Sequence, residues 1–131
     1  MDAEKINALF NKYTITSETD LKGTITYVSQ PFVDICGYTK EELLGSNHRL
    51  IRHPDMPDLV FQEMWDTITN KEIWSGEVKN RKKDGGYYWV DSVVFPIMDE
   101  EDNITGYKSI RVDITAKKEK EEILKDLLGE V

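Results

Sequence analysis

The chain has 131 residues, which predicts one domain because a single hydrophobic core normally spans about 100 to 150 residues. Hydrophobic residues make up 39% of it and charged residues 32%, a composition too apolar for a disordered protein. Basic residues number 17 and acidic residues 25, so the net charge is −8. Such a charge repels nucleic acid and anionic membrane surfaces, which argues against both as partners.

Targeting signals and cysteines narrow the class further. No apolar run approaches the roughly 18 residues that a membrane span needs, and the opening MDAEKINALFNK lacks the order of a signal peptide. The single cysteine, Cys36, excludes an intrachain disulfide framework and a multi-cysteine zinc site. We therefore expect a cytoplasmic protein that does not insert into a membrane and reaches one only through a partner.

The N-terminal part of the chain predicts a helix followed by a hairpin. Apolar residues recur at helical spacing between residues 2 and 12, which indicates a short amphipathic helix. Short β-rich runs follow from Thr14 to Val28, and Asp20 and Gly23 bracket a tight turn between them.

Helices are expected next. Two short ones fit Pro31 to Leu44, and the second has a capping box of Thr39 and Glu42 and ends at Gly45. After an irregular segment, a longer helix is predicted from about Pro57 to Thr69. Its apolar side chains form one stripe: Val60, Phe61, Met64, Trp65 and Ile68.

The C-terminal half predicts three strands and an exit helix. The strands span about residues 74–82, 87–98 and 104–114, joined by a DGG turn and an acidic turn. After Thr115 the sequence AKKEKEEILKDLL has helical, coiled-coil-like spacing, which suggests a partner. The element order predicts an α+β domain with an antiparallel sheet and helices on one face.

A polar, cation-rich stretch, GSNHRLIRHPDMP, contains both histidines and two arginines and precedes the helix that carries Phe61 and Trp65. Cations beside aromatic rings suit an anionic, planar ligand, so we interpret this region as a cofactor pocket. No Ser/His/Asp order, phosphate loop or pair of carboxylates on a shared face is visible, and we predict that the chain is not an enzyme.

Asn80 is a candidate ligand contact on the first of the three C-terminal strands. Because side chains alternate along a strand, Trp74, Gly76, Val78 and Asn80 share one face, which we expect to be the inner one. A buried amide needs hydrogen-bond partners, and the carbonyl and N–H edge of a flavin would supply them. Gly76 would leave room for a ring to approach the sheet. The alternative is that Asn80 bonds to backbone or caps a loop.

Over residues from about Ser17 to Thr115, the chain resembles the PAS sensor-domain family. The matching motifs are GYTKEELLG, a KDG turn followed by Tyr88 and Trp89, and a DIT sequence before the exit helix. The resemblance implies a PAS fold with a five-stranded antiparallel sheet and short helices on one face. It divides the chain into an N-terminal flanking helix (1–13), a PAS sensor domain (14–115) and a C-terminal signalling or linker helix (116–131).

The chain is similar to the PAS domains of bacterial aerotaxis and energy-taxis receptors in four motifs: RHPDMP, WSG, VKNR and YWV. This resemblance implies noncovalent FAD, redox sensing, a chemoreceptor-type signalling partner and a homodimer formed through the flanking helices. The chain is then a component of a split receptor or the sensor of a longer protein. The cofactor-binding residues implied by the motifs and patterns are Ser29, His48, Arg49, Arg52, His53, Asp55, Phe61, Trp65, Trp74, Asn80, Trp89 and Arg111.

Flavin-binding light sensors of the same fold carry an Asn-Cys-Arg motif whose cysteine forms an adduct with the flavin. Here the matching residues are Asn47, His48 and Arg49, and Cys36 lies outside the motif. Arg111 stands where those sensors use a glutamine, and a cation near the ring would favour an anionic reduced flavin. The comparison predicts a redox reporter and not a light switch.

Other interpretations of these residues stay open in the sequence. Arg49, Arg52 and His53 could be loop cations paired with Asp55 or Asp58. The two tryptophans on the strands, at positions 74 and 89, could simply pack on the sheet. The spacing of His48 and His53 does not suit a metal pair on a helix, although either could be the axial ligand of a haem-binding PAS domain. A PAS module that binds no ligand and only dimerises is a further alternative.

Overall fold

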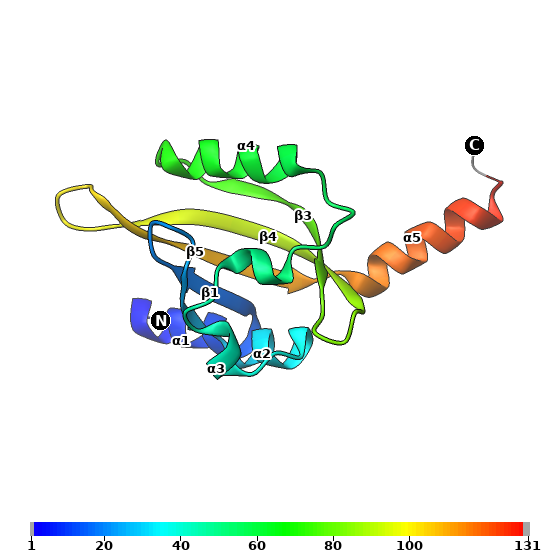
Figure 1. Ribbon diagram of the computed structural model, residues 1–131, viewed down its shortest axis with the longest axis horizontal. Coiled ribbons are helices and arrows are strands. Elements are labelled where there is room, and N and C mark those ends of the chain that lie inside the picture. Colours follow the sequence, from blue (N-terminus) through cyan, green and yellow to red (C-terminus); the bar gives the residue numbers. More distant parts are fainter. Residues whose placement is uncertain (1, 130–131) are drawn as a thin grey trace.

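The computed structural model describes residues 2–129. These residues form six helical and five strand elements (Figure 1). The helical elements are α1 (Ala3–Tyr13), α2 (Gln30–Cys36), α3 (Lys40–Leu43), the 3-10 helix η1 (His48–Ile51), α4 (Asp58–Thr69) and α5 (Thr115–Leu127). The strands are β1 (Ile15–Thr19), β2 (Ile25–Val28), β3 (Trp74–Arg81), β4 (Tyr87–Met98) and β5 (Ile104–Asp113).

All five strands form one antiparallel sheet in the order β2-β1-β5-β4-β3 (Figure 1). The N-terminal hairpin therefore lies beside β5, the last strand of the chain, and β3 forms an edge. This arrangement confirms the predicted α+β class and the five-stranded antiparallel sheet. It also places residues from both ends of the sequence on one sheet surface.

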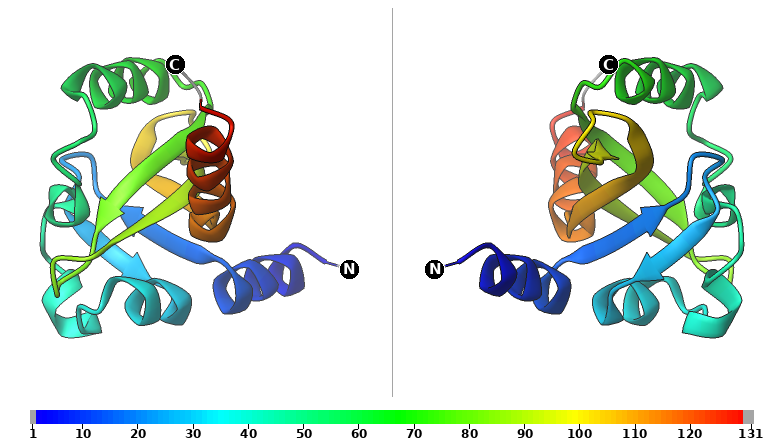
Figure 2. Two further views of the ribbon diagram at one scale, coloured as in Figure 1. Left: turned by 90° about the vertical axis from the view of Figure 1, so that its right-hand side faces the viewer. Right: turned by 90° about the vertical axis from the view of Figure 1, so that its left-hand side faces the viewer.

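The helices α2, α3, η1 and α4 cover one face of the sheet, while α1 and α5 lie on the opposite side (Figure 2). The main core fills the space under the covering helices and includes Phe32, Leu43, Ile51 and Val90, each at most 2% exposed. Side chains of alternate strand residues supply the sheet side of this core, as the two-residue period of a strand requires. Because these helices form a layer over the sheet, a cavity can lie between the helices and the sheet.

Local sequence signals explain most of the element boundaries. The Thr39–Glu42 capping box opens α3, and the Asp20 carboxylate accepts hydrogen bonds from the backbone N–H groups of Lys22 and Thr24 in the hairpin turn. Both signals were predicted from the sequence. Strands β3 and β5 each end one residue earlier than expected. The segment predicted as irregular contains η1, a single turn too short for a periodic signal.

Helix α5 is attached to the sheet through polar contacts at its first turns. The Lys118 ammonium lies 3.0 Å from the Glu77 carboxylate and 4.6 Å from the centre of the Trp89 ring. Further along α5, Ile123 and Leu127 are exposed. Among residues 2–129, no helix combines the length and apolarity required to cross a bilayer.

Candidate functional site

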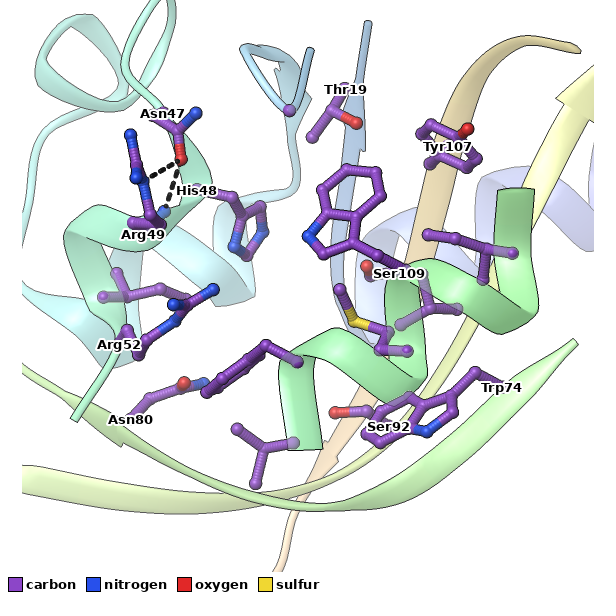
Figure 3. Close-up of a pocket in the computed structure, with 18 of the residues that line it drawn as sticks. Thr19, Asn47, His48, Arg49, Arg52, Trp74, Asn80, Ser92, Tyr107 and Ser109 are labelled. Carbon is purple, nitrogen blue, oxygen red and sulfur yellow. Dashed lines mark hydrogen bonds between the residues drawn. The ribbon is translucent and has the colours of Figure 1, made fainter. Parts of the chain in front are cut away.

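A cavity of about 350 Å³ lies between the sheet and the layer formed by η1 and α4 (Figure 3). Its volume falls within the range of small-molecule and cofactor sites, about 300 to 1,000 Å³. Every strand except β2 contributes to the lining. The lining residues are Thr19, Lys22, Gly23, Asn47, His48, Arg49, Ile51, Arg52, Phe61, Met64, Trp65, Ile68, Trp74, Val78, Asn80, Ser92, Val94, Tyr107, Ser109 and Arg111.

Short backbone bridges hold the η1 segment against the sheet. Asn47 pairs with Thr24 near the hairpin, and Arg52 pairs with Asn80 on β3. The side-chain Oδ1 of Asn47 caps η1 by accepting hydrogen bonds from the backbone N–H and the Nε of Arg49, at 3.0 and 3.2 Å (Figure 3). These contacts fix the backbone of η1 and direct His48 and Arg52 toward the sheet.

The first group of cations at the cavity, which we call the mouth cluster, comprises Lys22, Arg49 and Arg52. Lys22 and Arg49 are exposed, and Arg52 is half-buried with its guanidinium carbon 3.7 Å from the centre of the Phe61 ring. Within residues 2–129, no ion pair involves these three residues and no aspartate or glutamate lines the cavity. In a chain of net charge −8, this local excess of positive charge favours an anionic ligand.

A second group, which we call the inner cluster, comprises Ser17 on β1, His48 on η1 and Arg111 on β5. Arg111 is 5% exposed, and its Nη2 lies 2.7 Å from His48 Nε2 and 3.1 Å from Ser17 Oγ. Burial lowers the pKa of Arg111 to about 10, so its guanidinium still carries a positive charge at neutral pH. Burial, reinforced by Arg111, lowers the pKa of His48 to about 3, so its imidazole is neutral.

Asn80 faces the cavity as the strand alternation predicts, and it is 4% exposed. No hydrogen bond joins its amide to the lining residues drawn in Figure 3. The Tyr88 hydroxyl, opposite Asn80 in the sheet register, is also without a hydrogen-bond partner among the described residues. Burial raises the pKa of Tyr88, and the nearby Arg111 guanidinium and Asn80 amide oppose this rise only in part. Because Asn80 lines the cavity, a ligand can reach its amide.

Aromatic side chains also line the cavity. Trp65 and Phe61 reach it from α4, and the Trp65 ring packs edge-on against Tyr107 of β5 with centroids 5.3 Å apart. Trp74 reaches it from β3. A Cβ at Gly76 would lie 2.8 Å from Cζ2 of Trp74, so this glycine makes room for the Trp74 indole. The expectation that Gly76 leaves space for a ligand ring is corrected accordingly.

The structure brings eight of the twelve predicted site residues to the cavity: His48, Arg49, Arg52, Phe61, Trp65, Trp74, Asn80 and Arg111. They come from η1 and its C-cap, from α4, and from the more distant strands β3 and β5. Only the η1 and α4 residues are near neighbours in the chain. These eight residues are therefore brought together by the fold and not by proximity in the sequence.

Ser29 and Trp89 are placed outside the cavity. The Ser29 hydroxyl is buried beside β1, where it donates to the Thr14 carbonyl and accepts from the Thr16 N–H, both at 2.9 Å. Trp89 lies on the opposite face of the sheet, under the Lys118 ammonium. Its odd position on β4 puts it out of phase with the lining residues Ser92 and Val94.

His53 and Asp55 also lie outside the cavity, beyond the end of η1. His53 Nδ1 accepts a hydrogen bond from the Asp55 N–H at 3.0 Å. The Asp55 carboxylate is 66% exposed and lies 2.9 Å from the Lys79 ammonium, whose hydrogen bond lowers the pKa of Asp55. For these two residues the structure matches the alternative in which loop charges pair with each other.

Some lining residues were not identified from the sequence. Ser92 and Ser109 carry small polar side chains on the inner faces of β4 and β5, and Tyr107 supplies a phenol ring. The alternation on β5 that points Arg111 inward also points Tyr107 and Ser109 inward, so the signal was present. Lys22 gave no signal, because only the folded hairpin carries its exposed side chain to the mouth. Among the described residues, no three His, Cys, Asp or Glu side chains are close enough to hold a metal ion.

Comparison with known proteins identifies the family. The PAS fold family model matches residues 25–111. The chain is 47% identical over 102 residues, 78% of its length, to the aerotaxis receptor of Escherichia coli (strain K12). It is 33% identical over 99 residues, 76% of its length, to a nitrogen fixation regulatory protein of Klebsiella pneumoniae. The matches span about a fifth of the length of these two relatives, 20% in each case.

Solved structures agree with this result. A PAS domain from Colwellia psychrerythraea aligns with a TM-score of 0.77 and 26% identity, over 86% of this chain and 96% of that one. A light-oxygen-voltage domain studied with a flavin analogue aligns with a TM-score of 0.79 over 100% of this chain and 98% of that one, at 24% identity. The fold, the family model and the sequence identities together show that this chain belongs to the PAS family of sensor domains.

Proposed function

We propose that this chain is a redox-sensing PAS domain that binds FAD noncovalently and reports the redox state of the flavin to a chemotaxis signalling partner. The observation that carries the proposal is the cavity lining, which combines aromatic rings, four cations, an available amide and no carboxylate among residues 2–129. A ligand that is planar, anionic and able to bond to an amide suits this lining. FAD has all three properties, and its bound ring would supply reversible electron transfer.

The cavity residues have distinct roles in this proposal. Phe61, Trp65 and Trp74 pack against the rings of the cofactor, while Asn80 bonds to the polar edge of the flavin. The mouth cluster binds the pyrophosphate, because guanidinium groups form charge-assisted hydrogen bonds with phosphate oxygens. Similarity to an aerotaxis receptor supports redox or energy sensing as the signal. Residues outside the cavity are not assigned to the cofactor.

Light sensing through a cysteine adduct has less support. Cys36, the only cysteine, lies on α2 with no exposed surface, and it is not among the residues that line the cavity. Burial also raises the pKa of its thiol, which makes the nucleophilic thiolate less available. The residue in the adduct position of the light sensors is His48. The chemistry of the lining therefore favours a redox reporter.

Haem binding has less support for a similar reason. His48 is the one histidine that lines the cavity within the described residues, and its Nε2 already accepts from Arg111. Axial ligation through Nε2 would require this contact to break and leave a buried cation without its acceptor. A PAS module without any ligand would leave the buried Arg111 and Asn80 without a ligand to bond to in the cavity, at a cost in desolvation.

We further propose that α5 and α1 connect the sensor to a chemoreceptor-type protein or domain in the cytoplasm and take part in a homodimer. Exposed apolar residues on α5 and α1, including Ile123, Leu127 and Phe10, support a contact with another chain. The division into flanking helix, sensor domain and linker helix belongs to this proposal.

The visible spectrum of the freshly purified protein, followed by identification of any ligand released by heat, tests the cofactor. Bands at about 375 and 450 nm, together with release of FAD, would support the proposal, because the oxidised flavin itself produces these bands. A Soret band would identify haem instead. A protein that stays colourless after FAD is added would favour the interaction module.

A further inference from the structure

Arg111 is held in place by neutral groups from three parts of the fold. Its Nη1 donates to the Ile15 carbonyl at 3.4 Å, and its Nη2 donates to Ser17 and to His48. The guanidinium also lies over the Phe32 ring, at 5.2 Å from its centre. These contacts fix the orientation of the cation but supply no negative charge.

No carboxylate of the described residues offsets this charge. The ionisable side chains that act on Arg111 most strongly are those of Tyr88 and Cys36, and burial raises the pKa of both, so both are neutral at pH 7. A buried cation without an anionic partner is costly, because it loses the hydration that it has in the unfolded chain. Arg111 also lines the cavity, so a ligand can approach it.

His48 determines where this cation lies. A guanidinium can only donate hydrogen bonds, so Nε2 of His48 must accept, and the ring proton must be on Nδ1. The Ser17 hydroxyl, 2.9 Å from the same nitrogen, can donate to it as well. No carboxylate acts appreciably on the imidazole, and the charged groups that face it, Arg111 from β5 and Arg52 from the end of η1, both oppose its protonation. His48 thus acts as a neutral acceptor that keeps Arg111 beside the cavity.

We propose that the inner cluster binds negative charge on the buried end of the ligand, so that the cavity binds reduced, anionic flavin more tightly than oxidised, neutral flavin. Arg111 is the binding residue and His48 is the positioning residue. Oxidised flavin takes up two electrons and one proton to give a reduced ring with one negative charge. Contact with Arg111 is stronger in that state, and a ligand changes an equilibrium only by its difference in affinity for the two states. This inference rests on the proposed flavin site.

The experiment compares the affinities of the wild-type protein and its variants for oxidised FAD in air and for dithionite-reduced FAD without oxygen. In Arg111→Gln, which keeps a donor but loses the charge, we expect the preference for reduced FAD to fall at least about tenfold. For a two-electron couple, a tenfold change lowers the reduction potential by about 30 mV. An unchanged ratio of affinities in Arg111→Gln would overturn the inference while leaving the flavin site intact.

Two His48 variants test positioning. His48→Gln retains an acceptor near the position of Nε2 and is expected to keep the wild-type preference for reduced FAD. His48→Leu removes the acceptor and is expected to lose part of that preference. A merely structural role would weaken both redox forms equally. Equal losses in the two forms for His48→Leu would therefore remove His48 from the inference.

Stability of the protein without flavin separates this inference from the proposed function. Because Arg111 is a buried charge without an anionic partner, Arg111→Gln should unfold at a urea concentration at least as high as the wild type does. A lower midpoint would contradict an uncompensated charge at this site. If the wild type binds FAD in neither redox state, the proposed function fails, and this comparison still decides the electrostatics of the inner cluster.

Discussion

The mouth cluster and the inner cluster are both positive, but their cations differ in exposure to water. Lys22 and Arg49 are exposed, so solvent and salt screen their charges, whereas Arg111 is 5% exposed. Screened cations attract phosphate groups at little cost to folding. A buried cation is costly to fold, and for the same reason it responds strongly to a change of charge nearby. We infer that the mouth determines whether a ligand binds and that the inner cluster distinguishes its charge states.

The largest effect that would test this contrast is the pH dependence of stability at His48. Its folded pKa of about 3 lies below the unfolded value of about 6.5, so between these values the unfolded chain binds a proton that the folded chain does not. This contribution to stability is complete above pH 6.5 and is lost as the pH falls toward 3. The slope is at most about 1.4 kcal/mol per pH unit.

Urea unfolding of the flavin-free protein at several pH values between 7 and 4.5 measures this slope. His48→Gln is the matched control, because it keeps the acceptor for Arg111 and cannot titrate in this range. The free energy of unfolding of the wild type should fall relative to that of the control as the pH is lowered. Parallel curves for the two proteins would mean that His48 takes up a proton equally well in the folded and the unfolded chain, and that its pKa is not lowered by folding.

A smaller effect is expected from the mouth and the aromatic wall. Arg52→Ala and Trp65→Ala should each reduce FAD occupancy, by about tenfold in affinity, because one removes a phosphate contact and the other a stacking surface. The far-UV circular dichroism spectrum should stay that of the wild type. Added salt should weaken FAD binding in the wild type more than in Arg52→Ala, since screening acts on the exposed cations.

A double variant of Arg52 and Trp65 that remains fully loaded with FAD would contradict the assignment of the cavity. Full loading of Arg52→Ala alone, with loss in Trp65→Ala, would limit the error to the mouth cluster. Other residues would then have to bind the phosphate groups, and Lys22 and Arg49 would be the next residues to substitute.

The smallest effect is expected at Asp55, close to the mouth in sequence but outside the cavity. Asp55→Asn removes an exposed ion pair with Lys79, and such pairs contribute little. FAD affinity, measured by equilibrium titration beside Arg52→Ala, should change by less than about twofold. A loss as large as that of Arg52→Ala would show that Asp55 acts on the ligand and that the site includes the loop between η1 and α4.

Much of the fold could be predicted from local signals in the sequence. Capping residues, turn residues and two-residue alternation indicated α3, the hairpin turn and the inward direction of Asn80, because each depends on backbone geometry within a few residues. The segment around η1 gave no such signal. Its path depends on bridges to Thr24 and Asn80, contacts that form only in the folded chain.

The site was harder to predict than the fold, for a physical reason. Motif similarity assigned Trp89 and Ser29 to the cofactor, but sheet alternation turns Trp89 to the face that supports α5, and the Ser29 hydroxyl bonds to β1. Arg111 was expected near a ligand ring, yet its partners were not foreseen. Ser17 and His48 are 94 and 63 residues away in the sequence, and only the position of β5 beside β1 brings them together.

Strand β3 joins two tasks through its alternating side chains. Asn80 faces the cavity, while Glu77, on the opposite face, holds Lys118 of α5. A one-residue slip in the pairing of β3 with β4 would exchange the two faces and put Lys79 or Arg81 where Asn80 now lies. Insertions or deletions within this strand would therefore abolish ligand contact and helix attachment in a single step. We expect evolution to vary the length of the flanking turns and to preserve the number of residues from Glu77 to Asn80.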